Sequence, residues 1–294
     1  MTTTFAPAKL ILFGEHAVVY GKHGIAVPIN DLQTKISIKK SDDTSYKIDR
    51  ILNENQKEKL DELIDFISKK LKKNFHLIIN SSVPISQGFG SSASISVAIL
   101  NAINEEFDLK YSRKKINELA YSCEKIFHGN PSGIDNTVIT YHKPLFFNKN
   151  DNEFFKIKTE LNLIIVNTGK RPHTKDTIEF VKNNYKLNTK RYDLIMDEIN
   201  NVSINAKDAL ENGDIKTLGK LMNKNHRLLQ KMKLNTPKID LFCELCLANG
   251  ALGAKLSGAG KGGNMIALVS NETKDKIISE LNFLTDEIHC VKIK

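Results

Sequence analysis

Glycines and small hydroxyl side chains meet in one stretch of the chain, Val83–Ser94 (VPISQGFGSSAS). Gly88 and Gly90 can adopt backbone angles that other residues reach only with strain, and they let main-chain N–H groups approach a ligand closely. Ser91 and Ser92 look like the start of a helix, where N–H groups and the helix dipole favour an anion. The stretch therefore predicts a phosphate-binding loop, although an ordinary strand-to-helix loop could contain similar residues.

Other side chains could complete a site for phosphoryl transfer, which needs a metal, a positive side chain and a group that orients or deprotonates the acceptor. Lys9 and Lys261 are the candidate cations. Glu124 lies against the apolar stripe of a predicted helix and, with the Ser92 hydroxyl, could bind the metal. Asp135, near the end of the tightly turned segment HGNPSGIDN, could be the base or could simply cap a regular element.

A group of titratable residues, Lys9, Glu15 and His16, lies in sequence that is otherwise typical of strands. A buried charge without a partner is costly, so such side chains either form pairs or face a cleft. A Lys9–Glu15 pair that stabilises a sheet is therefore the structural alternative to a role in binding.

The second Gly-rich segment, Lys255–Gly263 (KLSGAGKGG), does not have the pattern of a P-loop. In that motif Gly-Lys is followed by Ser or Thr, whereas here Gly262 follows Lys261. A dinucleotide-binding Rossmann motif is also excluded, because no βαβ unit with an acidic residue at the expected distance follows the first Gly-rich turn. The phosphate-binding arrangement must therefore be of another kind.

The composition is that of a globular protein whose positive net charge suits an anionic ligand. The 294 residues carry a net charge of +9, and 40% of them are hydrophobic. A basic surface raises the local concentration of anions. Nucleic-acid binding favours a dense basic stripe with interleaved aromatic residues, whereas the lysines here are scattered. We therefore expect no nucleic-acid partner.

The cysteines and the apolar segments also limit the possible functions. Cys243 and Cys246 lie in an apolar helical run without a second ligand pair, so they are predicted to be buried free thiols and not zinc ligands. The sequence shows no signal peptide and no apolar run of about 18 residues. These features predict a cytoplasmic protein that has no membrane span.

Hydrophobic spacing predicts the elements that must position these residues. Helices are expected over 60–71, from 91 and from 112, with a strand over 75–79 and a hairpin over 145–157. After a strand over 161–166 the chain becomes mostly helical, with helices near 191–211, 215–232 and 238–249, and it ends as strand, helix and strand. This change from mixed to mostly helical sequence predicts two domains, residues 1–170 and residues 171–294, and the first contains the predicted phosphate-binding loop.

Three blocks together resemble the GHMP kinase superfamily, in the order in which that superfamily has them: Ala6–Gly21, Pro84–Ser94 and Lys255–Gly263. Within the superfamily, GEHAVVYGKHGIAVPI and HGNPSGIDN are similar to segments of the mevalonate kinases. The resemblance implies an α+β fold of two domains, an N-terminal domain like ribosomal protein S5 and a ferredoxin-like C-terminal domain.

The resemblance also implies residue roles. Asp135 would be the catalytic base and Lys9 would stabilise the charge that develops, while Ser92 and Glu124 would hold Mg²⁺. ATP would be bound by residues of both Gly-rich segments: Pro84, Ser86, Gly88, Phe89, Gly90, Ser91, Ser92, Ala93, Gly258, Ala259, Gly260 and Lys261. The substrate would be bound by Lys9, Glu15, His16, Ser132, Asp135 and Thr174.

The implied activity is ATP-dependent phosphorylation of the C5 hydroxyl of (R)-mevalonate to 5-phosphomevalonate, a step of isoprenoid biosynthesis. ATP and mevalonate would be the partners, Mg²⁺ the cofactor, and the protein a homodimer. Two alternatives stay open: another GHMP small-molecule kinase acting on phosphomevalonate or a sugar, and a non-catalytic nucleotide- or RNA-binding protein.

Three residues depart from the pattern of the family. Ser86 and Lys261 stand where the family usually has Gly, and Asn264 stands where it has Cys. Ser86 is expected to be tolerated if its backbone angles are ordinary. Lys261 is expected to contact a phosphate, with a solvent-facing side chain as the alternative.

Overall fold

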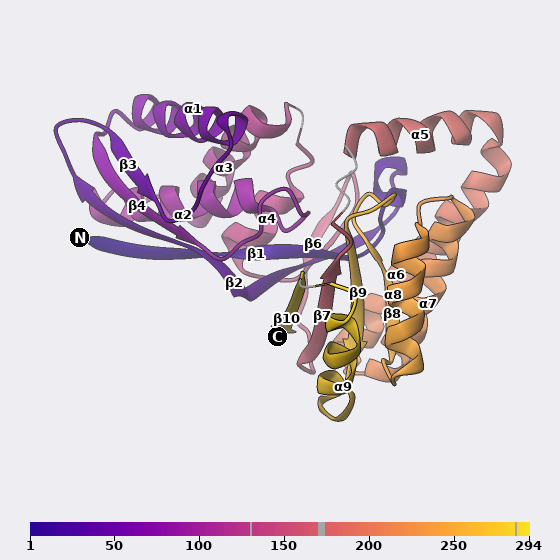
Figure 1. The fold of residues 1–294 in the computed structure, drawn as a ribbon. Coiled ribbons are helices and arrows are strands. Elements are labelled where there is room, and N and C mark those ends of the chain that lie inside the picture. Colours follow the sequence, from indigo (N-terminus) through magenta and orange to yellow (C-terminus); the bar gives the residue numbers. More distant parts are fainter. Residues whose placement is uncertain (130, 170–173, 286) are drawn as a thin grey trace. The chain divides into compact units, whose positions relative to one another are not determined.

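The structure is a computed structural model that describes residues 1–129, 131–169, 174–285 and 287–294 (Figure 1). The chain forms two compact units. The first unit consists of Met1–Lys9 and Pro28–His142, and the second of Leu10–Val27 and Lys143–Lys294. Two long strands, β1 (Thr2–Phe13) and β2 (Gly24–Lys40), contribute residues to both units.

In the first unit, β2 pairs antiparallel with β4 (Phe75–Ser81), and the short strand β3 (Ser45–Ile48) pairs parallel with the other edge of β4. Four helices complete the unit: α1 (Glu54–Leu71), α2 (Ser91–Glu106), α3 (Arg113–His128) and α4 (Ile134–Tyr141). Alternate β4 residues Phe75, Leu77 and Ile79 are fully buried, as the period-2 pattern of a half-buried strand predicts. They share one core with apolar residues of the four helices.

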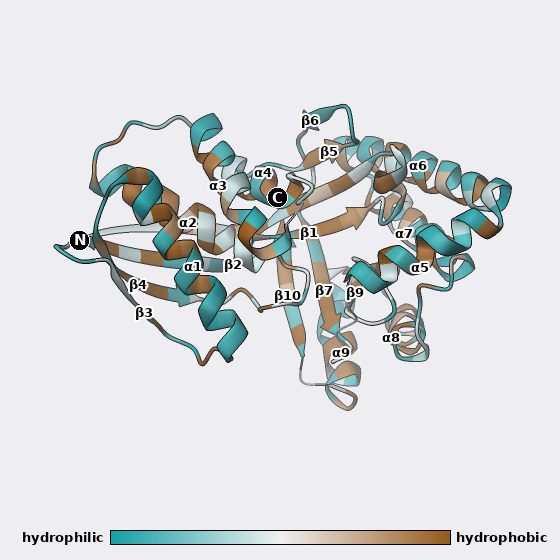
Figure 2. Cartoon of the chain, turned by 90° about the horizontal axis from the view of Figure 1, so that it is seen from above, coloured by the Kyte–Doolittle hydropathy of each residue, from teal (hydrophilic) through white to brown (hydrophobic). Residues whose placement is uncertain are grey.

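Local sequence signals explain where these helices begin. Asn53 and Gln56 form a reciprocal capping box at α1, and the Ser112 side chain accepts a hydrogen bond from the Lys115 N–H at α3. Figure 2 shows hydrophilic and hydrophobic residues mixed along α1, because only one stripe of that helix, including Leu63 and Ile67, is buried.

The second unit is built on an antiparallel sheet in the order β10 (Ile288–Ile293), β7 (Leu161–Asn167), β9 (Asn264–Val269), β8 (Gly253–Ser257). The two middle strands, β7 and β9, are largely hydrophobic (Figure 2). β8 is an edge strand, and helix α7 (Ile215–Lys231) packs along it.

Apart from its parts of β1 and β2, the unit has one further hairpin and several helices. The hairpin consists of β5 (Leu145–Phe147) and β6 (Asn152–Phe154), and β5 also pairs with Gly24–Ala26 of β2. The helices are η1 (Ala17–Tyr20, a 3₁₀ turn), α5 (Thr174–Leu187), α6 (Thr189–Asn212), α8 (Pro237–Ala248) and α9 (Asn271–Asn282).

The predicted α+β class with two domains is confirmed, and the hairpin and the long C-terminal helices lie where they were expected. The compact units nevertheless divide the chain at positions other than 170 and 171. Strand β7 was assigned to the first domain, but its hydrogen bonds to β9 and β10 place it in the second unit. The long strands β1 and β2 hide the division in the sequence, because each continues as regular strand from one unit into the other.

Three elements were not predicted from the sequence. Residues 17–20, in a region with strand-like sequence, form a 3₁₀ turn, and the sequence analysis did not identify β3 or α5. Cys243 and Cys246 are buried free thiols, as expected. Within the described residues, no helix combines the length and the apolar character that a membrane crossing requires.

Candidate active site

The predicted phosphate-binding loop in the first unit leads directly into α2. Three residues of the loop have left-handed backbone angles: Ser86 at φ +59°, Gly88 at φ +80° and Gly90 at φ +70°. Gly90 is the N-cap residue of α2 and has no side chain to pair with the first N–H groups of the helix. The loop therefore presents main-chain N–H groups at a helix N-terminus, the arrangement that suits an anion.

Ser86 corrects the expectation that its backbone angles are ordinary, because its φ lies in the left-handed region. The position keeps the conformation that glycine adopts without strain, although the residue has changed. Of the other predicted ATP-binding residues, Pro84 and Ser91 are half-buried, whereas Phe89 and Ala93 are fully buried. Neither Phe89 nor Ala93 exposes surface to a ligand in this structure, so their predicted contacts with ATP stay predictions.

Gly90 also makes room for the two predicted catalytic side chains. A Cβ atom at this position would lie 2.9 Å from Cγ of Lys9 and 3.4 Å from Oδ2 of Asp135. The Lys9 Nζ lies 3.0 Å from Asp135 Oδ1 in an ion pair, and the Lys9 side chain is 8% exposed. The structure thus brings Lys9 and Asp135 together beside the N-terminus of α2, and Lys9 does not pair with Glu15.

Asp135 is held by the start of α4. It lies in the first turn of that helix, after Gly133 at φ +81°. The next residue, Asn136, is buried and donates from Nδ2 to Oδ1 of Asn117 on α3 at 2.6 Å. This Asn117–Asn136 bond, which the sequence did not reveal, fixes α4 against α3 and so fixes the direction of Asp135.

The predicted metal ligands lie in the same unit. Glu124 is 2% exposed, and its Oε1 has no hydrogen-bond partner among the described residues. Burial, and next the nearby charge of Asp135, raise the pKa of Glu124 to about 7, against the opposing effects of Ser92 and Lys9. A buried carboxyl group with an unpaired oxygen beside a hydroxyl fits a hard cation such as Mg²⁺, which binds oxygen and relieves the repulsion between Glu124 and Asp135.

The His128 side chain contacts both predicted metal ligands, and the sequence analysis did not predict this contact. Its Nε2 lies 3.3 Å from Ser92 Oγ and 3.7 Å from Glu124 Oε2. Among the described residues, no cluster of three or more His, Cys, Asp or Glu side chains forms a metal site alone. Ser92 and Glu124 are the two protein groups that would hold a Mg²⁺ ion here, and magnesium sites in proteins ordinarily need no larger set of protein ligands.

In the second unit, Glu15 is fully occupied by protein partners. Its Oε1 forms an ion pair with Lys255 Nζ, and its Oε2 accepts a hydrogen bond from Asn225 Nδ2 at 3.0 Å. Both charged side chains are nearly inaccessible, with Lys255 at 0% and Glu15 at 1% exposure. Glu15 therefore stabilises the contact of its own turn with β8 and α7. A direct contact with a substrate would require Glu15 to leave these partners.

His16, predicted to bind substrate, adopts a left-handed φ of +61° and contacts the carbonyl oxygen of Ala259 through Nε2 at 2.7 Å. Since a carbonyl only accepts, Nε2 carries the proton and Nδ1 is the acceptor nitrogen. Burial lowers the pKa of His16, against the effects of Ala259 and Glu15, and so favours the neutral ring. Neutral His16 thus ties the Glu15–His16 turn to the loop Gly258–Gly263.

Lys261, in that loop, has φ +58° where the family usually has glycine. Its Nζ lies 3.1 Å from the centroid of the Phe180 ring on α5, in a cation–π contact. The expected phosphate contact of Lys261 stays a prediction, because the described contact is with Phe180. Asn264, in place of the usual cysteine, is buried and accepts from Asn167 Nδ2 at 2.8 Å.

The structure gives little support for a substrate contact at two of the predicted substrate-binding residues, Ser132 and Thr174. Ser132 is exposed, and its Oγ accepts from the Ile134 N–H at 3.4 Å, so it shapes the turn before α4. Thr174 begins α5, but its side chain lies outside the described residues.

The sequence analysis missed the partners Lys255 and Asn225. Lys255 carried a usable signal, because a lysine inside the apolar strand Gly253–Ser257 needs a buried counter-charge. Asn225 carried none, because a polar residue on a long amphipathic helix is ordinary.

Comparisons with known proteins agree on one family. Residues 58–143 match the GHMP kinases N terminal domain, and residues 206–285 match the GHMP kinases C terminal region. The chain is 36% identical to the mevalonate kinase of Methanocaldococcus jannaschii, over 94% of each chain. It is 33% identical to that of Pyrococcus furiosus, over 92% of this chain and 90% of the relative.

A solved structure of L. major mevalonate kinase in complex with R-mevalonate has a TM-score of 0.90 to this chain. The two sequences are 28% identical, and the match covers 100% of this chain and 96% of the other. Together with the relatives above, this likeness extends over both units and both Gly-rich segments. The chain belongs to the mevalonate kinase family of the GHMP kinases.

Proposed function

We propose that the protein transfers the γ-phosphoryl group of ATP to the C5 hydroxyl of (R)-mevalonate, forming 5-phosphomevalonate. The observation that carries this proposal is the Lys9–Asp135 ion pair beside the glycine-marked N-terminus of α2. A carboxylate and a cation lie there next to a phosphate-binding turn, which is the set of groups that phosphoryl transfer to an alcohol requires. The names of the relatives supply the substrate.

Asp135 is the proposed base. Its carboxylate takes the proton of the acceptor hydroxyl as that oxygen attacks the γ-phosphorus, and the bond from the γ-phosphorus to the leaving ADP oxygen breaks. Lys9 holds Asp135 in place and stabilises the negative charge that develops on the attacking oxygen. Because Lys9 is nearly buried, its charge acts through little intervening water and is weakly screened.

The N-terminus of α2 and the loop before it bind the phosphates in this proposal, mainly through main-chain N–H groups of residues 88–92. Ser92 and Glu124 would hold Mg²⁺, which neutralises phosphate charge when it is bound. The loop Gly258–Gly263 provides further main-chain contacts to the nucleotide, and His16 contributes to substrate binding. A homodimer and a cytoplasmic location stay predictions.

An assay of ADP release with purified protein tests the activity. We expect ADP release that depends on both mevalonate and Mg²⁺, and the matched reactions with phosphomevalonate, galactose and homoserine should stay at the background rate. Saturable turnover of one of those alcohols without turnover of mevalonate would reassign the substrate within the GHMP kinases. Salt-dependent RNA binding without any phosphoryl transfer would favour the nucleic-acid alternative.

The role of Asp135 has its own test. Asp135→Asn keeps the shape of the side chain but cannot accept a proton, so kcat should fall by about 10²- to 10⁴-fold. Binding of a fluorescent ATP analogue should survive in this variant. Asp197→Asn, which removes a half-exposed carboxylate paired with Lys22, is the matched control and should keep the wild-type rate. An Asp135→Asn enzyme with near wild-type kcat would remove Asp135 from the role of base.

A further inference from the structure

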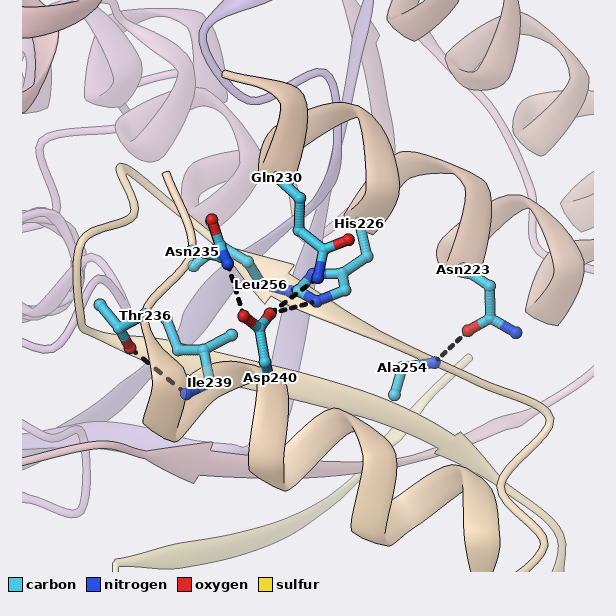
Figure 3. A network of polar contacts seen from close by, with 9 residues as sticks. All are labelled: Asn223, His226, Gln230, Asn235, Thr236, Ile239, Asp240, Ala254 and Leu256. Atoms are coloured by element: carbon cyan, nitrogen blue, oxygen red, sulfur yellow. Dashed lines mark hydrogen bonds and ion pairs between the residues drawn. The ribbon is translucent and has the colours of Figure 1, made fainter. Parts of the chain in front are cut away.

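The edge strand β8 leads into the loop Gly258–Gly263, and helix α7 holds its free edge. The Ala254 N–H donates to Oδ1 of Asn223 at 2.8 Å, and the Leu256 N–H donates to Nδ1 of His226 at 3.3 Å. Figure 3 shows both acceptors reaching β8 from the same helix. Two main-chain N–H groups that an edge strand would leave unpaired are thus bonded to side chains of α7.

α7 and β8 can approach this closely because glycines face each other. A Cβ atom at Gly219 of α7 would lie 2.3 Å from the Leu252 carbonyl oxygen. A Cβ atom at Gly253 of β8 would lie 2.3 Å from the Gly219 carbonyl oxygen. Because the two backbones are in direct contact, β8 has little freedom to slide along α7. Within this contact, the hydrogen bonds of Asn223 and His226 fix which residues of β8 lie beside which residues of α7.

The proton of His226 is placed by its two partners. Because the Leu256 N–H can only donate, Nδ1 accepts, and the proton is on Nε2, which donates to Asp240 Oδ1 at 3.0 Å. Gln230 Nε2 donates to the same oxygen at 2.9 Å, and Asn235 Nδ2 donates to Asp240 Oδ2 at 2.5 Å. Figure 3 shows these donors converging on the carboxylate of Asp240. Asp240 therefore selects the tautomer of His226 that can accept from β8.

Lys255, the buried partner of Glu15, lies between Ala254 and Leu256, the two residues whose N–H groups are bonded to α7. Its N–H faces β9 in the sheet, and its side chain forms the ion pair with Glu15. The same helix α7 also supplies Asn225, which donates to the other Glu15 oxygen. One helix thus fixes the strand before the Gly-rich loop and, through Glu15, the turn that carries His16.

We infer that His226, in its Nε2–H tautomer and held by Asp240, is a positioning residue for the loop Gly258–Gly263 and for the Glu15–His16 turn. His226 has no predicted contact with substrate or nucleotide and acts only through Leu256 of β8. This inference rests on the proposed function, because it assigns His226 to the nucleotide- and substrate-binding segments of that reaction. It predicts that the loss of one hydrogen bond, from Leu256 to His226, weakens ligand binding.

Two substitutions of His226 separate its two hydrogen bonds. In His226→Asn the amide oxygen can take the place of Nδ1 and still accept from Leu256, although the contact with Asp240 is lost. In His226→Gln the amide N–H₂ can take the place of Nε2 and still donate to Asp240, although the contact with Leu256 is lost. We expect His226→Gln to raise the Kd of an ATP analogue and the KM for ATP about tenfold, the effect of losing one hydrogen bond, with a smaller change in kcat.

His226→Asn should stay closer to wild type than His226→Gln in both constants. The control is His76→Gln on β4 of the first unit, where the imidazole contacts the exposed Ser45 hydroxyl, and it should not change either constant. Equal defects in the two His226 variants, or wild-type constants in both, would overturn the inference. The free energy of unfolding of each variant is also measured in urea. It shows whether a rise in Kd or KM comes only from partial unfolding of that variant.

The imidazole ¹⁵N shifts of wild-type His226 provide a test that needs neither a variant nor turnover. A protonated Nε2 and an unprotonated, hydrogen-bonded Nδ1 are expected, and the opposite tautomer would overturn the inference. The two proposals can fail separately. Absence of mevalonate-dependent ADP release from the wild-type protein contradicts the proposed function, whereas an active wild type with the wrong tautomer contradicts only the role of His226.

Discussion

Two residues that depart from the family keep the backbone that glycine would adopt. Ser86 and Lys261 have φ values of +59° and +58°, in the left-handed region where a side chain is strained. The sequence comparison alone would suggest that these turns had changed. The structure indicates instead that the turn is retained at the cost of strain, since the path of the chain past a ligand depends on backbone angles.

Ser86→Gly should relieve this strain. We expect the free energy of unfolding in urea to stay constant or to rise by up to about 1 kcal/mol, because glycine tolerates a positive φ but loses more entropy on folding. Ser41→Gly is the matched control at an exposed position without a positive φ, and it should be destabilised by about 0.5–1 kcal/mol. Equal destabilisation of the two variants would mean that Ser86 is not strained.

The ion pair between Lys255 and Glu15 leads to a second prediction at this scale. Lys255→Met leaves the Glu15 carboxylate buried without its counter-charge, so the free energy of unfolding should fall by about 3–5 kcal/mol. In the double variant Glu15→Gln with Lys255→Met the uncompensated charge is gone, and much of the stability should return. Additive losses in this double-mutant cycle would show that the two side chains do not interact.

How much of the site the sequence could predict depends on how each residue is recognised. Lys9, Glu124 and Asp135 were chosen as candidates because a charge in an apolar strand, a carboxylate on an apolar stripe and an acid in a rigid turn are each unusual locally. The structure brings all three together with Ser92. Lys255 indicated the need for a buried counter-charge, but the sequence could not show that Glu15 is that partner or that Asn225 joins them, because these contacts link segments more than 200 residues apart.

At the scale of elements, strong periodic patterns were read correctly and weak ones were missed. β4 alternates buried and half-buried residues over its whole length, and the helices α6 to α8 begin at recognisable caps such as Asp214 and Thr236. β3 has only four residues, too few to show a period. In α5, Thr177 and Val181 are the buried residues between exposed charged ones, so its apolar stripe is too narrow to identify.

The contact between α7 and β8 makes stability depend on pH. Burial lowers the pKa of His226, against Asp240, which raises it; Lys255 lowers it further and Glu244 raises it slightly. In the unfolded chain His226 binds a proton near pH 6.5, whereas in the folded protein it binds one only at lower pH. The stability that comes from burying neutral His226 is therefore complete above pH 6.5 and is lost as the pH falls below that value.

We expect the free energy of unfolding of wild type to decrease between pH 7.5 and pH 5.5 more steeply than that of His226→Gln. The difference between the two proteins isolates His226 from other histidines with lowered pKa values, such as His16 and His142. Urea unfolding at several pH values measures it. Parallel pH profiles would mean that the folded protein accepts a proton on His226 as easily as the unfolded chain does.

At the scale of the whole molecule, the two units share strands although each has its own core. β1 passes from one unit to the other after Lys9, and β2 does so after Val27. The last part of β2 pairs with β4 in the first unit, and its first part pairs with β5 in the second. Unfolding either unit would therefore fray a strand on which the other depends.

This sharing predicts a single cooperative unfolding transition, although proteins of this size with two domains often show two. The chain has no tryptophan, so one introduced Trp reports on its own unit. Phe66→Trp on α1 reports on the first unit and Phe154→Trp on β6 on the second. The urea midpoints of the two fluorescence signals should coincide with each other and with the loss of far-UV circular dichroism. Two separated midpoints would show that the shared strands do not couple the units, and that each unit unfolds as an independent domain.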